Sequence, residues 1–526
     1  MPNTTNRPDI VFVVLDTHRL DRLGCYGYSR NTTPNIDAFA REATLYEHAI
    51  APAQWTIPVH ASWFTGEPPS THMTVQSGDA LDERYVTLAD RLRANGYRTV
   101  GFCNNPLVGV INNGFKRGFD AFYNYSGAVR TVFRSAERLP PLVRTAWEGY
   151  RRAMRRITDP IQNAVATSNQ VFQAALNPLW VPLWTRFAHF KGDTPRSVRD
   201  AARYVRQEMN GGDRSPCFLF LNLMEPHLPY SPAERFVREF APYFKEEQRA
   251  RDFVHNLNTQ AGRWLIPMDR PYTELEARTL SDVYDAEVAY QDHVLAELFE
   301  ILDGAAHREN TVVIVAADHG EMLGEHQLMG HGFGVYQELI HVPLLIRRPG
   351  QTSGQQRADL VSTGRIFHTV LDLAGEEVYQ TGRGLTIDLG AESLMHEAYE
   401  ADGGNRVVFS EAYAPDFALD CLERYLPHLI QERHARATNW AVCDEASKLI
   451  RVEGVGETLY SWPDDPHEMF GLDARLDGVT ARRLGSQLDV FLEQASARRP
   501  SSGARGRADL DDEVVRQRLR GLGYIE

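Results

Sequence analysis

Three apolar runs along the chain each end in charged or imidazole side chains. Their sequences are DIVFVVLD (9–16), PCFLFLNLMEPH (216–227) and TVVIVAADHGE (311–321). Short, continuously apolar runs of this kind predict strands that are buried on both faces of a parallel sheet. The carboxyl ends of parallel strands meet at one edge, where open α/β sheets bind ligands. We therefore expect one site that contains Asp16, Asp318, His319 and His227.

Amphipathic stretches between these runs predict helices at 35–43, 86–95 and 280–302. Strands that alternate with helices indicate an α/β fold with a mainly parallel sheet between helices. We expect this α/β domain to span residues 1–400 and to carry the site at the strand ends. Short antiparallel strands within 439–469 and a helix at 479–496 predict a small C-terminal α+β domain over 401–500, followed by a tail over 501–526.

Residues from about 125 to 210 interrupt this alternation, because they are rich in Arg, Trp and long apolar side chains. They predict a helical insert with three interpretations: a subdomain packed on the sheet, a lid over the substrate, or a segment at a membrane surface. Pro178 and Pro182 interrupt any continuous apolar helix face, which favours a lid over a membrane anchor.

Composition narrows the class of protein. The chain has 526 residues, of which 43% are hydrophobic and 24% charged, as in ordinary globular proteins. A net charge of -14 argues against nucleic acid as a partner. The five cysteines form no CxxC pair, the start does not resemble a signal peptide, and no apolar run could span a bilayer. We expect a cytoplasmic protein without stable membrane insertion. Whether it forms a homo-oligomer stays an open question.

Asp16, Asp318 and His319 offer two carboxylates and an imidazole. This set suits one divalent metal ion such as Mn²⁺, Zn²⁺, Ca²⁺ or Mg²⁺ rather than a soft thiolate metal. Taken singly, an aspartate that ends a strand is often only a helix cap. The prediction of a metal site depends on the three residues lying together.

The segment QWTIPVHASWFTG (54–66) places the hydroxyl of Thr56 at the start of a predicted helix. A helix N-terminus directs free N–H groups at an anion and favours a group that becomes negatively charged there. Thr56 could equally be an ordinary N-cap, with Pro58 in the first turn. Composition alone leaves both interpretations open.

Several blocks of the chain resemble the sulfatase family of the alkaline phosphatase superfamily. They are, in family order, VVLDTHRLDRLGCYGYSRNTTPNIDAFAREAT, WTIPVHASWFTG, VVIVAADHGEMLGEHQLMGHG, YQELIHVPLLIR, LYSWPDDPHEMFGL and RLRGLGYIE. Residues 125–215 and 350–400 are matched poorly. The resemblance implies an alkaline-phosphatase-like α/β fold: a large sheet flanked by helices, then a small domain with an antiparallel sheet.

The resemblance also implies roles for single residues. Asp16 is similar to the family's first metal carboxylate, and Asp318 and His319 to its second acidic ligand and the neighbour. His227 resembles a substrate-contacting histidine and is a candidate general acid. His331 lies where many members have a lysine that contacts the anion. Asn104 and Ser77 fall near polar contacts to the substrate.

The departures from the family are specific. A sulfatase carries C/S-x-P-x-R and oxidises its Cys or Ser to formylglycine, whereas this chain has Thr56-Ile57-Pro58-Val59-His60. No formylglycine is expected, and His60 replaces the arginine as an anion clamp. Thr17 replaces the second aspartate of the usual pair, so one carboxylate is lost. With these changes the pattern of residues resembles that of phosphonate monoester hydrolases and phosphodiesterases.

We therefore predict a metal-dependent hydrolase, or transferase to an alcohol, that acts on small-molecule anionic esters, namely phosphate mono- or diesters. Thr56 is the predicted nucleophile, and the reaction passes through a covalent phospho-enzyme. Two alternatives stay open. One is a sulfuric ester hydrolase that works without formylglycine, and the other is a catalytically impaired pseudo-sulfatase that only binds an anion.

Overall fold

The computed structural model describes residues 7–126, 131–134, 191–210, 214–380, 386–396, 407–473, 478–499 and 506–507. The predicted insert lies outside these ranges between 135 and 190, as does most of the predicted tail. No helix in the described ranges has the length and apolar character needed to cross a membrane.

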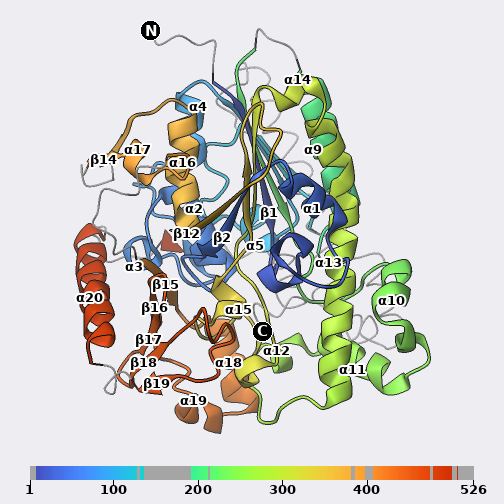
Figure 1. Cartoon of the computed structure of the whole chain (residues 1–526), viewed down its shortest axis with the longest axis vertical. Coiled ribbons are helices and arrows are strands. Elements are labelled where there is room, and N and C mark those ends of the chain that lie inside the picture. The colour runs from blue at the N-terminus through green and yellow to red at the C-terminus, as the bar shows by residue number, and fades with distance from the viewer. Residues whose placement is uncertain are drawn as a thin grey trace, which may run out of the picture.

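The three predicted strands lie side by side in the middle of a mixed sheet (Figure 1). They are β1 (Asp9–Leu15), β7 (Cys217–Leu223) and β8 (Thr311–Ala317), every residue of which is buried. Both neighbours pair with β1 in parallel, and Leu15 is opposite Leu223 on one side and Ala317 on the other. The next residues along these strands therefore leave the sheet at one edge.

The sheet has nine strands in the order β12-β2-β11-β8-β1-β7-β4-β5-β6. Its outer strands are β2 (Thr44–Ile50), β4 (Arg98–Cys103), β5 (Ala121–Asn124), β6 (Thr131–Arg134), β11 (Leu344–Arg347) and β12 (Gln355–Ser362). β11 runs antiparallel to both of its neighbours, β8 and β2, and β6 runs antiparallel to β5. The mainly parallel sheet is confirmed, with antiparallel pairs on each side of its centre.

Helices cover both faces of this sheet (Figure 1). One group contains α1 (Pro34–Ala40), α9 (Thr194–Glu208) and α13 (Glu274–Leu302), and the other contains α2 (Thr56–Thr65), α4 (Leu88–Ala94) and α16 (Ile366–Leu373). Thr87 before α4 and Thr273 before α13 each form a capping box with the residue three positions on, which fixes where these helices start. The helices predicted at 35–43, 86–95 and 280–302 correspond to α1, α4 and α13.

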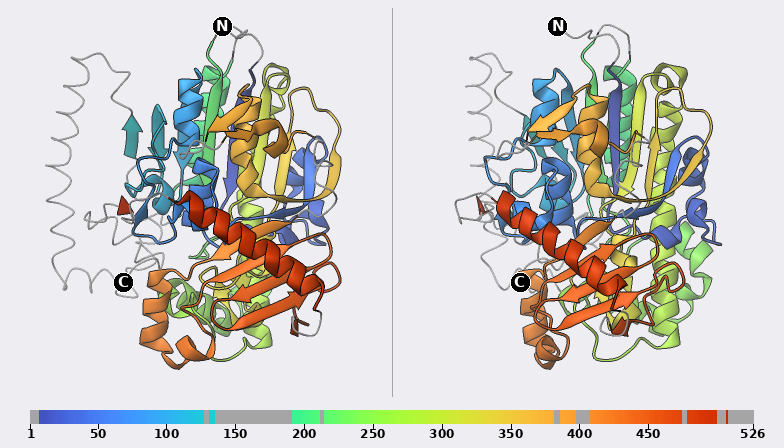
Figure 2. Two further views of the ribbon diagram at one scale, coloured as in Figure 1. Left: turned by 90° about the vertical axis from the view of Figure 1, so that its left-hand side faces the viewer. Right: turned by 60° about the vertical axis from the view of Figure 1, so that its left-hand side comes forward.

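A second sheet of five antiparallel strands follows the nine-stranded sheet along the sequence (Figure 2). Its strands are β15 (Val408–Ala412), β16 (Asn439–Cys443), β17 (Lys448–Val452), β18 (Gly456–Tyr460) and β19 (Leu472–Asp473). The helix α20 (Thr480–Arg498) packs Leu484 and Leu488 against Val442 and Leu449 of this sheet. The predicted small domain with an antiparallel sheet is confirmed.

Short elements complete the described chain. They are α3 (Pro69–His72), α5 (Pro106–Gly109), α10 (Glu234–Phe240), α11 (Gln248–Thr259), α12 (Ala261–Trp264), α14 (Ala305–Arg308), α15 (Gln337–Ile340), α17 (Leu389–Glu392), α18 (Asp416–Tyr425) and α19 (His428–Glu432), with the strand pairs β3–β20 (Asp79–Ala80, Gly506–Arg507), β9–β10 (Met322–Leu323, Met329–Gly330) and β13–β14 (Val378–Gln380, Thr386–Asp388).

Candidate active site

Asp16, Asp318 and His319 converge at the carboxyl edge of β1 and β8. One ligand atom from each of the three lies within 4.8 Å of the others, and all three side chains are fully buried. His319 Nε2 is 3.9 Å from Asp16 Oδ1 and 3.5 Å from Asp318 Oδ2. The register of β1 against β8 produces this cluster. Leu15 is paired with Ala317, and Asp16 and Asp318 are the residues that follow them.

The imidazole of His319 is held in the form that suits a metal ligand. Its Nδ1 donates to the carbonyl of Gly320 at 2.9 Å, so Nε2 keeps its lone pair on the side of the two carboxylates. Burial holds the pKa of His319 well below its usual value, and the neighbouring His331 adds to this effect. The ring is therefore neutral at ordinary pH.

The two carboxylates divide their oxygens between the protein and the cluster. Asp318 Oδ1 accepts from the amides of Thr17 and His319, and Asp16 Oδ2 accepts from Asn105 Nδ2 at 2.5 Å. Asp16 Oδ1 and Asp318 Oδ2 are buried without a hydrogen-bond partner among the described residues. Burial raises the pKa of Asp16 well above its usual value and that of Asp318 to about 7. A divalent cation fits this site, because it would satisfy both oxygens and balance both charges.

Thr17 has a strained backbone next to the cluster. Its φ of 55° lies in the left-handed region, which a β-branched residue rarely adopts. In this conformation its amide donates to Asp318 and its carbonyl accepts from Tyr284 Oη at 2.6 Å. The residue that replaces the family's second aspartate thus orients Asp318 through its backbone.

Thr56 is the first residue of α2 and is fully buried beside the cluster. Its Oγ1 lies 3.3 Å from His319 Nε2. The helix cap is Trp55, and no side chain makes a capping hydrogen bond there. Thr56 is therefore not the ordinary N-cap that its position in the sequence also allowed. Its hydroxyl lies where the helix N-terminus and the three candidate ligands meet.

Both ring nitrogens of His60 face protein groups. Nδ1 donates to the carbonyl of Thr56 at 2.9 Å, and Nε2 is 3.3 Å from the side-chain amide of Asn222, from which it accepts. The ring is fully buried against Trp63 and Phe220, and burial lowers its pKa to about 4. In this structure His60 joins the first turn of α2 to the strand β7.

His227 and His331 flank His319. The ring centroid of His331 is 4.5 Å from that of His319 and 5.1 Å from that of His227. His227 Nδ1 donates to the carbonyl of Leu228, and burial holds the pKa of His227 well below its usual value. His331 Nδ1 donates to Glu321 Oε1 at 2.9 Å. The structure therefore brings both histidines to the cluster.

Two buried residues that sequence reasoning missed also contact this group, namely Asn105 and Glu321. Asn105 is bonded to Asp16, whereas its predicted neighbour Asn104 instead donates to Thr194 Oγ1 at 2.7 Å and to the carbonyl of Lys191. The doublet in GFCNNP was the available signal, because only one of two adjacent side chains leaving a strand points in a given direction. Glu321 was visible in the DHGE sequence but had no assigned role.

Ser77 lies in the loop after α3. Asp79 Oδ2 holds this loop by accepting from the amides of Val75 and Gln76. Within the described part of the chain, Ser77 makes no hydrogen bond to the cluster, although its side chain is largely buried.

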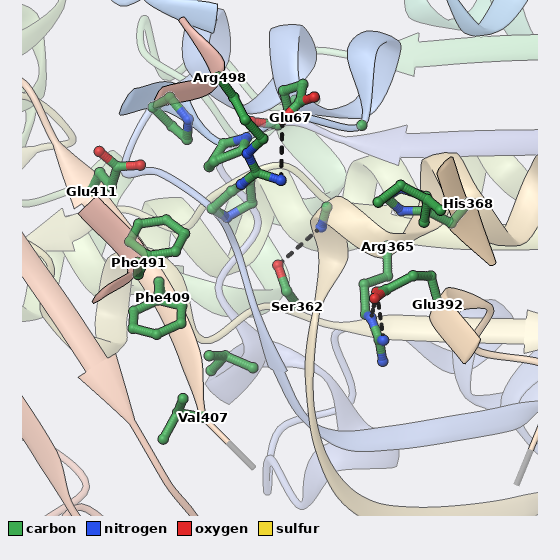
Figure 3. A pocket seen from close by; sticks show the side chains of 18 of the residues that line it. Glu67, Ser362, Arg365, His368, Glu392, Val407, Phe409, Glu411, Phe491 and Arg498 are labelled. Carbon is green, nitrogen blue, oxygen red and sulfur yellow. Dashed lines mark hydrogen bonds and ion pairs between the residues drawn. The ribbon is translucent and has the colours of Figure 1, made fainter. Parts of the chain in front are cut away.

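A cavity of about 320 Å³ lies at the other end of α2, between the two sheets (Figure 3). Ser62 and Gly66 contribute to its wall, which also contains the ion pair of Glu67 with Arg498 and that of Arg365 with Glu392. The residues of the cluster are not part of this wall. The cavity is therefore separate from the candidate active site.

A mixed sheet with two carboxylates, an imidazole and a helix-terminal hydroxyl at its edge is the arrangement that the resemblance to the alkaline phosphatase superfamily implies. The model of the family Sulfatase matches residues 8–376. The chain therefore belongs to the sulfatase family and is a hydrolase of that superfamily.

The relatives carry several names. The chain is 24% identical to an uncharacterized sulfatase, YidJ, of Escherichia coli, over 92% of this chain and 87% of that protein. It is also 24% identical to the multifunctional alkaline phosphatase superfamily protein PehA of Trinickia caryophylli (70% and 74%) and to human iduronate 2-sulfatase (72% and 70%).

Solved structures show the same fold. The phosphonate monoester hydrolase of Agrobacterium radiobacter superposes with a TM-score of 0.62 at 20% identity, over 93% of this chain and 96% of that one. The structure of BT4656 with its substrate D-glucosamine-2-N,6-O-disulfate superposes with a TM-score of 0.62 at 16% identity, over 95% and 100%.

Proposed function

We propose that this protein is a metal-dependent hydrolase of phosphate mono- or diesters in which Thr56 is the nucleophile. The observation that carries the proposal is the position of the Thr56 hydroxyl, buried at the start of α2 and 3.3 Å from His319 Nε2. Threonine cannot be converted into the formylglycine of sulfatases, so the unmodified hydroxyl is the candidate nucleophile at this position.

Asp16, Asp318 and His319 would hold one divalent cation, of which Mn²⁺, Zn²⁺, Ca²⁺ and Mg²⁺ are the candidates. When bound, such a cation supplies positive charge that favours an ionised hydroxyl and holds the phosphoryl oxygens. The backbone N–H groups at the start of α2 carry partial positive charge, which adds to the positive potential that the cation would produce beside Thr56. Both effects favour an anionic ester beside Thr56.

The proposed chemistry takes place in two steps. The hydroxyl proton of Thr56 passes to solvent water, and Oγ1 forms a bond to phosphorus while the bond from phosphorus to the leaving oxygen breaks. We assign His227 as the proton donor to that oxygen; because Nδ1 already donates to Leu228, this role requires Nε2 to take up a proton when the anionic ester binds. We assign His331 as a contact for the phosphoryl group. Water then attacks phosphorus and the bond from phosphorus to Thr56 Oγ1 breaks, so that the phosphate product leaves and a proton from the attacking water restores the hydroxyl.

The choice of phosphorus over sulfur follows from the second step. A hydrated formylglycine expels sulfate by collapsing to its aldehyde, and a sulfated threonine has no such route. Water can instead attack the phosphorus of a phosphothreonine. Sulfate esters stay the second candidate substrate, because relatives that cover most of the chain carry the names of sulfatases.

Paired substrates and variants of Thr56 test the proposal. With Mn²⁺ added, para-nitrophenyl phosphate monoester, diester and sulfate should separate the classes of substrate. Thr56→Ala should lower kcat by about 10⁴-fold or more, as for other nucleophiles, and Thr56→Ser should retain measurable turnover. Thr65→Ala is the matched control, because Thr65 ends the same helix and its hydroxyl bonds to the carbonyl of Ala61 and the amide of Glu67, which are not part of the cluster.

Intact-protein mass spectrometry on acid-quenched enzyme should detect an added phosphoryl group that is missing in Thr56→Ala. Parent-like turnover in Thr56→Ala would exclude direct attack by Thr56. Turnover of the sulfate alone would favour the second candidate. Anion binding without turnover of any of the three would favour a pseudo-sulfatase.

A further inference from the structure

A chain of buried polar side chains lies behind His227, and the chemistry proposed above does not use it. Asn104 Nδ2 donates to Thr194 Oγ1 at 2.7 Å, and this hydroxyl lies 2.9 Å and 2.7 Å from the two carboxylate oxygens of Glu225. All three side chains are buried. Because a hydroxyl has one proton, Thr194 accepts from Asn104 and donates to Glu225, which gives the chain one direction.

Glu225 is two residues before His227, in the loop that follows β7. The helix α13 holds both ends of this loop. Gln291 donates to the carbonyl of Glu225, and Glu287 Oε1 accepts from the amide of Ser231. Lys191, just before α9, pairs with the same oxygen of Glu287 at 2.8 Å. The loop that carries His227 is therefore fixed from two helices.

At its Asn104 end, this row of hydrogen-bonded side chains lies next to the cluster of Asp16, Asp318 and His319. Asn104 and Asn105 are adjacent at the end of β4, and Asn105 donates to Asp16 Oδ2. One short segment thus links a candidate metal carboxylate to the loop of His227. A shift at either end would change the distance between the two halves of the site.

We propose that Asn104, Thr194 and Glu225 are positioning residues that hold His227 at a fixed place relative to Asp16. This inference rests on the proposed function in one respect, namely that His227 protonates the leaving group. Buried networks of this kind define one geometry when every member is paired, and they lose it when one member is removed. General acids contribute about 10²- to 10⁴-fold to rates, and small displacements remove much of that gain.

The test compares a good and a poor leaving group. Thr194→Val removes the hydroxyl at nearly constant volume. For the phenyl ester, which needs a proton on its leaving oxygen, kcat should fall about 10- to 100-fold. For the para-nitrophenyl ester, which needs little protonation, kcat should change by less than about threefold. KM should be unchanged for both, and Thr194→Ser should restore the phenyl rate.

Controls separate this inference from the proposed function. His227→Asn should give the same dependence on leaving group with a larger loss. Lys448→Met breaks another buried ion pair, far along the chain on β17, and should give no such dependence. If His227→Asn gives the dependence and Thr194→Val does not, the positioning role is wrong while the proposed function stands. If His227→Asn gives none, the acid assignment fails.

If the acid assignment fails, NMR still tests directly whether Thr194 positions His227. The ¹⁵N resonances of the His227 imidazole should shift in Thr194→Val and return in Thr194→Ser, whatever step His227 performs. Unchanged resonances would overturn the positioning role. Should Thr194→Val fail to fold, Glu225→Gln offers the same comparison, because it removes the charge and keeps the shape of the side chain.

Discussion

The ionisation of two buried aspartates determines how the candidate site should respond to pH. Burial raises the pKa of Asp318 to about 7 and that of Asp16 well above its usual value, whereas His319 stays neutral. Protons therefore compete with a cation at low pH. The affinity for Mn²⁺ should rise with pH, by about tenfold per unit below pH 7 for each proton displaced, and level off once both carboxyls are ionised.

Isothermal titration calorimetry with Mn²⁺ across this range measures the effect. Asp318→Asn should abolish measurable binding. Asp292→Asn is a suitable control, because burial also raises the pKa of Asp292, to about 6, yet this residue bonds to the start of α1. An affinity that does not change with pH would contradict the assignment of the two aspartates as ligands.

At the residue scale, the sequence predicted the groups that leave strand ends and helix starts. Asp16, Asp318, His319 and Thr56 lie together because strand register and the start of α2 fix their backbone. Asn105 could not be separated from its neighbour, because the choice depends on which side chain faces the cluster. Local sequence carries little of that information.

At the scale of elements, α2 depends on a side chain that the sequence presented as an anion clamp. His60 bonds to the first turn of its own helix and to Asn222 on β7. His60→Phe keeps the aromatic volume and leaves the amide of Asn222 unpaired. We expect the free energy of unfolding to fall by about 1–3 kcal/mol.

Kinetics distinguish the two roles of His60. As an element of α2, it should affect kcat with KM unchanged, because the position of Thr56 shifts while the anion contacts remain. A contact with the bound anion would instead raise KM. Thr65→Ala removes two hydrogen bonds at the far end of the same helix and should leave both constants near those of the parent.

The sequence predicted helices and strands correctly where the pattern of apolar and polar residues was strong. The buried strands and the long helix α13 lie where their patterns indicated, although α13 starts at Glu274 rather than 280 because the Thr273 capping box extends it. The antiparallel placement of β11 was not predicted. A four-residue buried strand carries no pattern that specifies its direction or its neighbours.

At the scale of the whole molecule, the order of the family blocks predicted two sheets but not how they are joined. The junction includes a fully buried ion pair, Lys448 Nζ with Glu468 Oε1 at 2.6 Å. Lys448 also donates to the carbonyl of Val335, and Glu468 accepts from the amide of Gln337. The bonds to Val335 and Gln337 connect β17 and the loop after β18 to the start of α15, and each of these two bonds joins positions more than a hundred residues apart in the sequence.

Removing one partner of this pair should weaken the whole molecule. Lys448→Met leaves the carboxylate of Glu468 buried and unpaired, so the free energy of unfolding should fall by about 3–5 kcal/mol in urea denaturation. The double variant Lys448→Met/Glu468→Gln should lose less than the sum of the two single losses, because neither charge is then left without a partner. Additive losses would show that the two charges do not stabilise each other in the folded protein. The kcat of the folded fraction should stay at the parent value in each variant, since the pair contacts none of the residues that hold Thr56.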